Sequence, residues 1–488
     1  MNIKVFSNLI ILFIFNIGYS QINLDARMLG LNGSYTNLAS GYQCVGINPA
    51  NLGSSSNRTL NIINTSFGFR NNFFSLATYN DISGANLEDS LSFDYYPKID
   101  LLNKFGGIGL RLNQNFILPY PLLNFSSKNI AFTSQMKFSI DMGIPEALFD
   151  LILFGNPIGK EFSIGLEEYI VFNQEFGFSY AKKFNGFMLG TSIKYLMGIF
   201  YMGVEEVNSS YIKTDITAFT GQSQYLIQQA IGGAGLGLDI GFSTEELPNG
   251  IKIGSSIINL LGTIKWTQSN FIRSNLENTI SNAAGDYYLR QNEMLYYSFL
   301  IDSINASSFS GSGSDSLITS QNYNVVIVSD SSSIPWHLLS SDDSLKVIFS
   351  DIGYLVPSET LYDSLTNDTD SPFLTREPAY FRLGLSKRWP ENVIIAGDLV
   401  TGFSNRLGSS DKWRLSIGAE ILKFNPFIIR CGYALGGYEK SSFSLGSGYH
   451  LGPIWFDFGF ALKGGFNIEN AKGFDLSLGV TWRSKIKD

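Results

Sequence analysis

The sequence has little charge, almost no cysteine or histidine, and no long hydrophobic run after its first residues. Only 16% of its 488 residues are charged, against about 25% in ordinary soluble domains. Two cysteines and two histidines exclude a disulfide-rich scaffold and form no metal-ligand pattern. The net charge of −8, with no basic cluster to offset it, argues against a nucleic-acid partner. We therefore predict no metal, no cofactor and no enzymatic activity.

The amino terminus has the pattern of an export signal. Lys4 precedes the apolar run LIILFIF (9–15), and small residues follow up to Ser20. This pattern predicts a cleavable secretory signal peptide, because the run is shorter than the roughly 20 apolar residues that cross a bilayer as a helix. The exported chain is rich in aromatic residues (14%) and glycine (49 residues). A closed β-barrel is the other structure that satisfies its backbone within lipid.

Period-two alternation is clearest in the last third of the chain. In FDLSLGVTWR (474–483), apolar residues alternate with polar or small ones, and 454–463, 413–421 and 381–388 repeat the pattern. Such alternation places the two sets on opposite faces of a sheet. Strands of about ten residues, a polar face rich in Gly and Ser with charges of both signs, as a wet lumen allows, and aromatic residues near strand ends are typical of membrane barrels. A secreted β-sandwich also alternates and is the weaker alternative.

We therefore predict an all-β fold, a transmembrane antiparallel β-barrel of about 14 strands, in the bacterial outer membrane. The expected divisions of the chain are a signal peptide (1–20), an N-terminal hatch (21–58), the first part of the barrel (59–261), an extracellular loop insertion (262–377) and the C-terminal part of the barrel (378–488). Joints such as WPEN (389–392) are short and alternate with longer ones such as 464–472. Short turns lie on the periplasmic side of such barrels, so the insertion should emerge outside.

The first part of the barrel is less regular. Strands are expected at 59–69, 72–80, 105–117 and 129–142, although the first two could form one bent strand. PEALFDLILF (145–154) starts with Pro and Glu, which favour a helix start. We expect a short helix there, packed on the barrel rim or in the lumen.

GYQCVGINPANLG (41–53) lies before the first strand and mixes turn-forming residues with apolar ones. A barrel of about 14 strands encloses more space than its own side chains fill. We therefore interpret 21–58 as a hatch inserted in the lumen, where irregular backbone is tolerated because it is surrounded by protein. The expected gate consists of Gly46, Asn48, Pro49 and Ala50.

The stretch ARMLGLNGSYTNLASGYQCVGINPANLG resembles the amino-terminal hatch of the FadL/TodX class of outer-membrane channels, which ends in a similar Asn-Pro-Ala. LFGNPIGKEFS (153–163), 176–199 and 235–266 are similar to a FadL-like barrel family of gliding-type bacteria that has no assigned function. The resemblance implies a channel that admits hydrophobic molecules through a hatch and a lateral opening in the wall. A related barrel of the class acts in secretion and binds exported protein tails.

Inward-facing charges gather in the C-terminal part of the barrel. The lumen-facing candidates are Arg382, Arg414, Glu420, Arg430, Asp457 and Asp475. Mutual pairing across a wet lumen is the favoured interpretation, because unpaired buried charge is costly; a cationic patch that holds a carboxylate ligand is the alternative. Cys431 is expected to face lipid, which would exclude a disulfide to Cys44 in the hatch.

The leading functional hypothesis is uptake of small hydrophobic compounds, of the fatty-acid or hydrocarbon class, by diffusion past the hatch. It predicts an apolar tunnel beside Asn48–Ala50 and a break in the barrel wall. The alternative is a surface or secretion-associated barrel that binds a protein partner through its loops, with a filled lumen and a folded external cap. The expected partners are thus outer-membrane lipid, a hydrophobic small molecule and, in the alternative, a protein.

Overall fold

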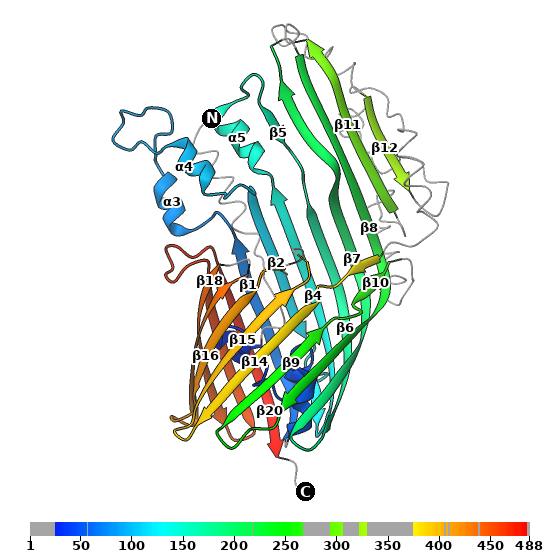
Figure 1. Ribbon diagram of the computed structural model, residues 1–488, viewed down its shortest axis with the longest axis vertical. Helices are drawn as coiled ribbons and strands as arrows, with labels where there is room; N and C mark the ends of the chain where they lie inside the picture. Colours follow the sequence, from blue (N-terminus) through cyan, green and yellow to red (C-terminus); the bar gives the residue numbers. More distant parts are fainter. Residues whose placement is uncertain are drawn as a thin grey trace.

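The computed structural model describes residues 25–55, 57–216, 218–266, 293–305, 322–328, 374–404, 407, 410–437 and 440–485. Fourteen strands within these ranges form one closed antiparallel ring in the order β1, β2, β4, β6, β7, β8, β9 and β14 to β20, and β20 pairs back onto β1 (Figure 1). The predicted barrel is confirmed. The expected signal peptide, 1–20, lies outside the described residues.

The strands of the ring are β1 (Asn57–Asn71), β2 (Leu110–Pro119), β4 (Ile130–Ile144), β6 (Glu168–Lys183), β7 (Phe187–Thr214), β8 (Ala218–Thr244), β9 (Ile251–Ile258), β14 (Tyr380–Trp389), β15 (Val393–Gly402), β16 (Arg414–Ile421), β17 (Phe427–Gly436), β18 (Ser441–Leu451), β19 (Ile454–Lys463) and β20 (Gly473–Lys485). Shorter or external strands are β3 (Phe125–Ser127), β5 (Glu161–Ser163), β10 (Thr263–Lys265), β11 (Glu293–Asn305), β12 (Asn322–Val328) and β13 (Leu374–Arg376). The helices are α2 (Ala26–Gly30), η1 (Gly41–Cys44), η2 (Pro49–Ser54), α3 (Leu76–Ile82), α4 (Lys98–Asn103) and α5 (Glu146–Phe154).

The two faces of the wall differ as the alternation predicts. Large apolar side chains point outward with no protein cover: Leu385 is 53% exposed, Ile417 56% and Leu445 50%. Their neighbours along the strands point inward and are polar or small, such as the buried Ser416 and Ser444. An apolar exterior around a polar interior is the arrangement of a membrane-spanning barrel. No helix among the described residues is long and apolar enough to cross a membrane.

The two ends of the barrel are unequal. At one end the strands are joined by short turns, such as the one at Asn392, which has a positive φ of 59°. The other end carries the long connections, and it is therefore the extracellular end. There β7 and β8, with 28 and 27 residues, rise well above the ring (Figure 1). β11 pairs with β8, and β12 pairs with β11. Most of the 262–377 insertion lies outside the described residues.

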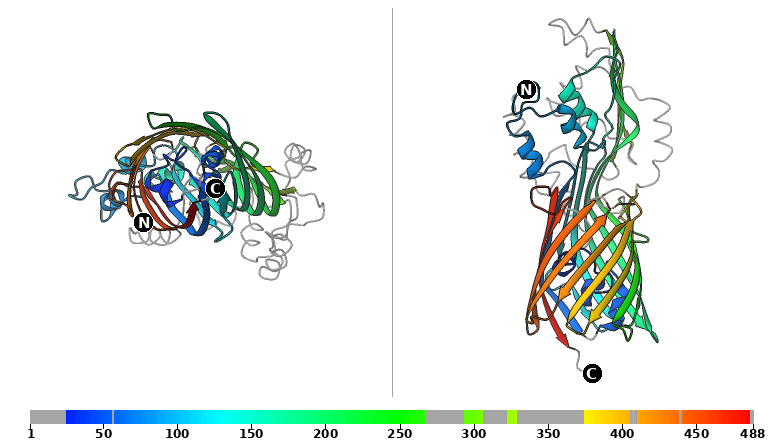
Figure 2. Two further views of the ribbon diagram at one scale, coloured as in Figure 1. Left: turned by 90° about the horizontal axis from the view of Figure 1, so that it is seen from below. Right: turned by 60° about the vertical axis from the view of Figure 1, so that its left-hand side comes forward.

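A small helical lobe stands opposite this tall sheet, above the rim (Figure 2). Its core stacks Phe73 on Phe105 at 4.0 Å between ring centroids and Phe105 on Phe149 at 4.1 Å. Phe149 belongs to α5, so the predicted helix at 145–154 is confirmed, but it packs in this lobe rather than on the rim or in the lumen. The helix α5 therefore packs against stacked aromatic rings of the lobe and not against the barrel wall.

The expected strand over 72–80 is wrong. Ser75 caps α3, because its hydroxyl accepts the amide hydrogen of Thr78 at 3.0 Å. This bond satisfies one of the free N–H groups at a helix start, and Phe73 and Phe74 just before it belong to the core of the lobe. Only 57–71 therefore forms a barrel strand. The two expected segments contribute one strand between them, and the number of strands in the ring is even.

The wall is interrupted between β2 and β3, at residues 120–124. Pro119 pairs with Gln135 of β4, and Phe125 pairs with Phe132, so five residues on one strand lie opposite only two on the other. Pro119 and Pro121 have no N–H to donate to a ladder, which explains why the strand cannot continue. Leu122 takes a positive φ of 63° in this bulge.

Candidate functional site: the hatch and the lumen wall

Residues 25–55 fold into a compact plug inside the ring (Figure 2). Asp25 caps α2 by accepting the amide hydrogen of Met28 at 2.9 Å, and Asn48 caps η2 by accepting that of Ala50 at 3.2 Å. Short helical turns let an irregular segment satisfy its own backbone groups within the lumen. The structure therefore places a hatch where the sequence predicts one.

The four expected gate residues are all buried in this plug. Gly46 has a φ of 77°, a conformation that favours glycine. Asn48 and Ala50 are both 0% exposed, and Asn48 Nδ2 donates to the carbonyl of Phe242 on β8 at 3.0 Å. The segment packs directly on the wall, so closely packed chain occupies the place of the tunnel that the uptake hypothesis puts beside Asn48–Ala50.

A belt of paired glycines lets the hatch approach the wall. The pairs are Gly190–Gly241, Gly254–Gly384, Gly418–Gly432 and Gly446–Gly459, from adjacent strands. A Cβ at Gly432 would lie 2.5 Å from the backbone of Leu31, and one at Gly190 would lie 2.4 Å from the amide of Ala50. Glycine on the inner face is expected of a wet lumen, whereas in the structure it gives the hatch room.

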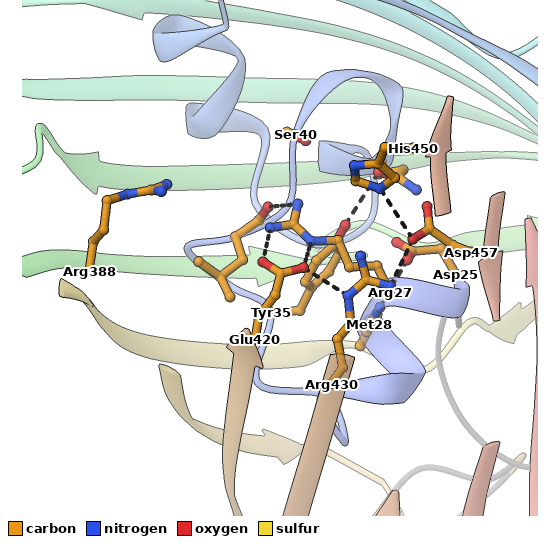
Figure 3. Close-up of polar contacts among 12 residues, drawn as sticks. Asp25, Arg27, Met28, Tyr35, Ser40, Arg388, Glu420, Arg430, His450 and Asp457 are labelled. Carbon is orange, nitrogen blue, oxygen red and sulfur yellow. Dashed lines mark hydrogen bonds and ion pairs between the residues drawn. The ribbon is translucent and has the colours of Figure 1, made fainter. Parts of the chain in front are cut away.

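Charged side chains of the C-terminal strands hold the first turn of the hatch (Figure 3). Arg27 of α2 forms a two-pronged contact with Glu420, at 2.8 and 2.7 Å. Glu420 also accepts from Arg430 at 2.8 Å, and Arg430 donates to Asp457 at 2.7 Å. Glu420 and Arg430 are both 1% exposed. This chain joins three of the predicted lumen residues to the hatch.

A second anchor lies on β14 and β15. One carboxylate oxygen of Asp398 accepts from the backbone amides of Tyr35 and Thr36 at 2.9 and 2.8 Å and from the Thr36 hydroxyl at 2.6 Å. Arg382 donates to that oxygen at 3.2 Å and to the carbonyl of Gly33 at 3.0 Å. Mutual pairing, the favoured interpretation of these charges, thus extends to the hatch backbone.

The other two predicted lumen residues lie nearer the external mouth. Arg414 donates to the carbonyl and side-chain oxygens of Asn32 at 2.9 and 2.6 Å. Asp475 pairs with Lys463 at 2.7 Å. All six predicted lumen residues therefore face inward, and five of them contact the hatch or a residue that holds it.

Sequence reasoning missed a further network on the opposite wall. Lys137 contacts Glu175 at 2.5 Å, Gln135 donates to Glu175 at 2.9 Å, and Lys194 pairs with Asp239 at 2.8 Å. Lys194, Glu175 and Asp239 are at most 1% exposed. The signal was present, because Lys194 stands between the apolar Ile193 and Tyr195 and therefore on the opposite face of the strand. This network places paired, buried charge on the inner face of β4, β6, β7 and β8.

Below the hatch, a cavity of about 800 Å³ opens at the end with short turns. Arg483 enters it from β20, where its guanidinium stacks on Trp455 at 3.9 Å and donates to Ser40 and Gln43 of the hatch at 3.1 Å. Trp455 in turn stacks on His450 at 3.6 Å between ring centroids. This chamber is polar and lies on the periplasmic side.

A much smaller cavity, about 40 Å³, lies between the hatch and the interruption in the wall. Val45 and Ile47 of the hatch line it on one side, and Ile117 and Pro119 of β2 line it on the other. Leu122 in the interruption is 59% exposed on the outer surface. Apolar side chains of the hatch and of β2 therefore meet, among polar neighbours, beside the bulge at 120–124.

The cysteines and titratable clusters complete the site. Cys44 is buried in the hatch, Cys431 is on the outward face of β17 with Phe427 and Ile429, and both are free thiols. Burial raises the pKa of the Cys44 thiol to about 12. Among the described residues, no group of three or more His, Cys, Asp or Glu side chains is placed to hold a metal.

A membrane-spanning barrel closed by an N-terminal hatch is the architecture expected of the FadL/TodX class, and the chain has it. The chain belongs to a family of unknown function, DUF5723, which matches residues 49–325. No curated protein matches it. The similarity to a subgroup from gliding-type bacteria stays a prediction.

Solved structures similar to the chain include the toluene transporter TbuX of Ralstonia pickettii, with 11% identity, a TM-score of 0.42, and coverage of 97% of this chain and 100% of that chain. The CymD monoaromatic hydrocarbon channel has 10% identity, a TM-score of 0.45, and coverage of 96% and 99%. The toluene transporter TodX of P. putida has 11% identity, a TM-score of 0.43, and coverage of 96% and 99%. At such identities and scores, these likenesses say nothing of what this chain carries.

Proposed function

We propose that the protein is an outer-membrane channel of FadL type that admits small hydrophobic compounds by diffusion past its hatch. The observation that carries the proposal is the interruption of the wall at 120–124 beside Val45 and Ile47 of the hatch. A compound that reaches this cavity contacts apolar side chains of both the hatch and β2, and polar side chains complete the lining. The wall in front of it is held by isolated backbone hydrogen bonds, from Tyr120 to Ser134, from Leu122 to Asn61 and from Asn61 to Asn124, in place of a regular ladder. Passage into the lipid there requires no chemical step.

The chain has the parts for a small opening at this point. Asn124 replaces the missing ladder by accepting the amide hydrogen of Ser134 at 2.9 Å and donating to the carbonyls of Tyr120 and Ser134 at 2.8 and 3.1 Å. Side-chain bonds of this kind contribute about 1 kcal/mol each. They are more easily exchanged than a continuous ladder, which suits an opening that forms transiently.

Uptake by cells that produce an Ile117→Trp variant tests the proposal. Ile117 is buried at the cavity, and the indole ring of a tryptophan there would occlude the cavity. Uptake of a labelled fatty acid and of toluene should therefore fall at least about tenfold. The control is Ile428→Trp, which introduces the same ring into the wide periplasmic chamber. Unchanged uptake in a folded Ile117→Trp variant would remove the support for this route.

A second candidate function is binding of a protein partner through the external loops. The loop between α3 and α4 exposes Leu91 and Phe93 almost completely, at 93% and 107%. Neighbouring exposed apolar side chains of this size are typical of interaction sites. A photo-crosslinking residue at Phe93 should then give a discrete adduct on cells, whereas the same residue at Ile468, also exposed (65%), should not. Equal labelling at both positions would count against this candidate.

A further inference from the structure

The external mouth contains a cavity of about 110 Å³ with a cationic lining. It lies where the end of β1 meets the loop from β19 to β20 and the start of β18. The described lining residues are Arg70, Asn71, Asn72, Lys440, Lys463, Gly464 and Lys472. Four of these are cations and none is a carboxylate, in a chain whose net charge is −8. A local excess of positive charge in an acidic protein calls for a specific explanation.

Lys472 is held firmly at this cavity. Its backbone amide donates to the carbonyl of Lys463 at 2.8 Å, and its own carbonyl accepts from the backbone and side-chain nitrogens of Asn71 at 2.9 and 2.8 Å. Its ammonium group donates to the backbone carbonyl of Asn72. That partner is neutral and an ammonium has three donors, so the charge of Lys472 is not neutralised by this contact.

Like charges surround Lys472. Burial, and then repulsion from Lys440 and Lys104, lower its pKa from the ordinary value of a lysine. Within the part of the chain that the structure describes, no carboxylate lies within ion-pair distance of Lys440 or Lys472. An anion between them would relieve this repulsion.

The inner half of the lining is buried. Arg70 is 3% exposed and Lys463 is 4% exposed. Lys463 also pairs with Asp475 at 2.7 Å, which offsets one of the four charges. A buried guanidinium and ammonium beside two more exposed lysines make a pocket with a fixed inner wall and an open outer side.

The positive lining continues inward to the hatch. Lys463 also lines a second cavity, of about 40 Å³, together with Lys412, Arg414 and the hatch residue Met28. Asp475 lines it too and pairs with Lys463, so cations outnumber carboxylates there without excluding them. Clefts with an excess of charge of one sign and low-dielectric walls raise the local concentration of the opposite ion. The path from the mouth to the outer face of the hatch therefore favours anions.

We propose that the cavity at Arg70, Lys440, Lys463 and Lys472 is a binding site for a compact oxyanion, the carboxylate or phosphate monoester group of a compound that approaches from outside. Its volume of about 110 Å³ corresponds to roughly three to four water molecules, at about 30 Å³ each. Arginine and lysine together suit such groups, one by bidentate contact and the other as a point charge. The site goes beyond the proposed uptake of hydrophobic compounds, since it binds the charged group whether or not the compound passes the hatch.

Equilibrium dialysis of the purified full-length barrel, in an uncharged detergent at low salt, tests the site with labelled inorganic phosphate and acetate. The Lys440→Gln/Lys472→Gln variant should bind at least tenfold more weakly, because two of the four cations of the lining are lost. Lys98→Gln is the matched control, because Lys98 is an external lysine that pairs with Glu88, and it should bind as the wild type does. Equal binding by the double variant and the wild type, or no saturable binding by the wild type, would overturn the proposal.

The same measurement in lipid nanodiscs identifies the source of the anion. Nanodiscs of phosphatidylcholine and nanodiscs that also contain phosphatidic acid are compared, with labelled phosphate as the probe. Loss of lysine-dependent phosphate binding only with phosphatidic acid would assign the site to a lipid headgroup. Binding that is equal in both would assign it to a free anion. Uptake by the Ile117→Trp variant does not enter either measurement, so the two proposals fail separately.

Discussion

The wall from β14 to β20 and the wall from β1 to β8 follow the same alternation but differ in regularity. The C-terminal strands have between 8 and 13 residues and tight periplasmic turns. The N-terminal wall includes a strand of 28 residues, helices between its strands and the interruption at 120–124. The regular wall supplies most of the charged contacts to the hatch, through Asp398, Glu420 and Arg414. The irregular wall supplies the cavity at Ile117 and the structures outside the membrane.

This difference shows how one repeating pattern supports two roles. A seat for the hatch requires strands in fixed register, because each anchor must meet its partner within hydrogen-bond distance. An opening requires a place where the ladder is already incomplete, because breaking a continuous ladder inside lipid would leave backbone groups unsatisfied. The chain separates the two requirements on different sides of the barrel.

The largest expected effect comes from removing the shared anchor of the regular wall. Glu420→Ala leaves Arg27 and Arg430 without their common carboxylate, both inside the lumen. Removing one partner of a buried ion pair costs about 3–5 kcal/mol, and here the free energy that keeps the hatch seated should fall by that amount. Limited proteolysis should therefore cut the hatch at least a hundredfold faster.

Glu245→Ala is the control for this variant, because Glu245 pairs with Lys183 at an exposed turn, with 38% and 59% of the two side chains accessible. Exposed pairs contribute no more than about 1 kcal/mol. If both variants were cut at the wild-type rate, the Arg27–Glu420 contact would not hold the hatch.

The next effect concerns the glycine belt. In Gly432→Val, the new side chain would collide with the backbone of Leu31 and Asn32. Overpacking of this kind costs about 1–3 kcal/mol, so the hatch should shift and the conductance of the barrel in a planar bilayer should rise. Gly397→Val is the matched control on β15, since a Cβ there would meet only the carbonyl of Ser416 at 3.5 Å. If the conductance of Gly432→Val equalled that of the wild type, the position of the hatch would not depend on this contact.

A smaller effect is expected at the interruption of the irregular wall. Asn124→Ala removes the acceptor for the amide of Ser134, which is buried. An unsatisfied buried donor costs about 1–3 kcal/mol, so hydrogen exchange at Ser134 should accelerate about tenfold or more. Asn129→Ala, at the neighbouring hairpin, loses only a bond to the carbonyl of Ala181 and should leave Ser134 unchanged. Equal exchange in the two variants would mean that Asn124 does not close the gap.

The smallest effect concerns the rates at which the two thiols react with a maleimide, a comparison that leaves the stability of the protein unchanged. Burial raises the pKa of Cys44 to about 12, and only the thiolate reacts with a maleimide. Labelling of Cys44 in the intact barrel should thus be very slow at pH 8 and rise about tenfold for each pH unit up to about pH 12. Cys431, on the lipid face, is the comparison within the same protein. Rapid labelling of Cys44 at pH 8 would show that the hatch leaves its seat readily.

The regular wall could be predicted from the sequence, and the irregular wall only in part. The alternation at 381–388, 413–421, 454–463 and 474–483 assigned the inward faces of β14, β16, β19 and β20 correctly. The prediction of a strand at 72–80 was wrong, because Ser75 caps a helix whose core partners come from other parts of the lobe. Pro119 and Pro121 carried a signal for the interruption, since neither can donate to a ladder.

The candidate site was predicted as a set of residues but not as a set of contacts. The inward direction of Arg382, Glu420 and Arg430 follows from the alternation, and so did the preference for pairing. Their actual partners in the hatch did not follow, and the inner-face glycines were assigned to a wet lumen although Gly432 and Gly190 meet the hatch backbone. Nothing in a glycine itself tells water from a neighbouring chain on its open side.

The sequence alone determined that this chain forms a barrel with an apolar outside and a polar inside, because side-chain direction along a strand is a local property with a period of two. It also determined that an irregular segment precedes the first strand. The tertiary structure decided what the polar inside touches, since Arg27 and Glu420 are 393 positions apart and meet only after the ring closes around the hatch. Closure is a property of all fourteen strands together, and no local pattern contains it.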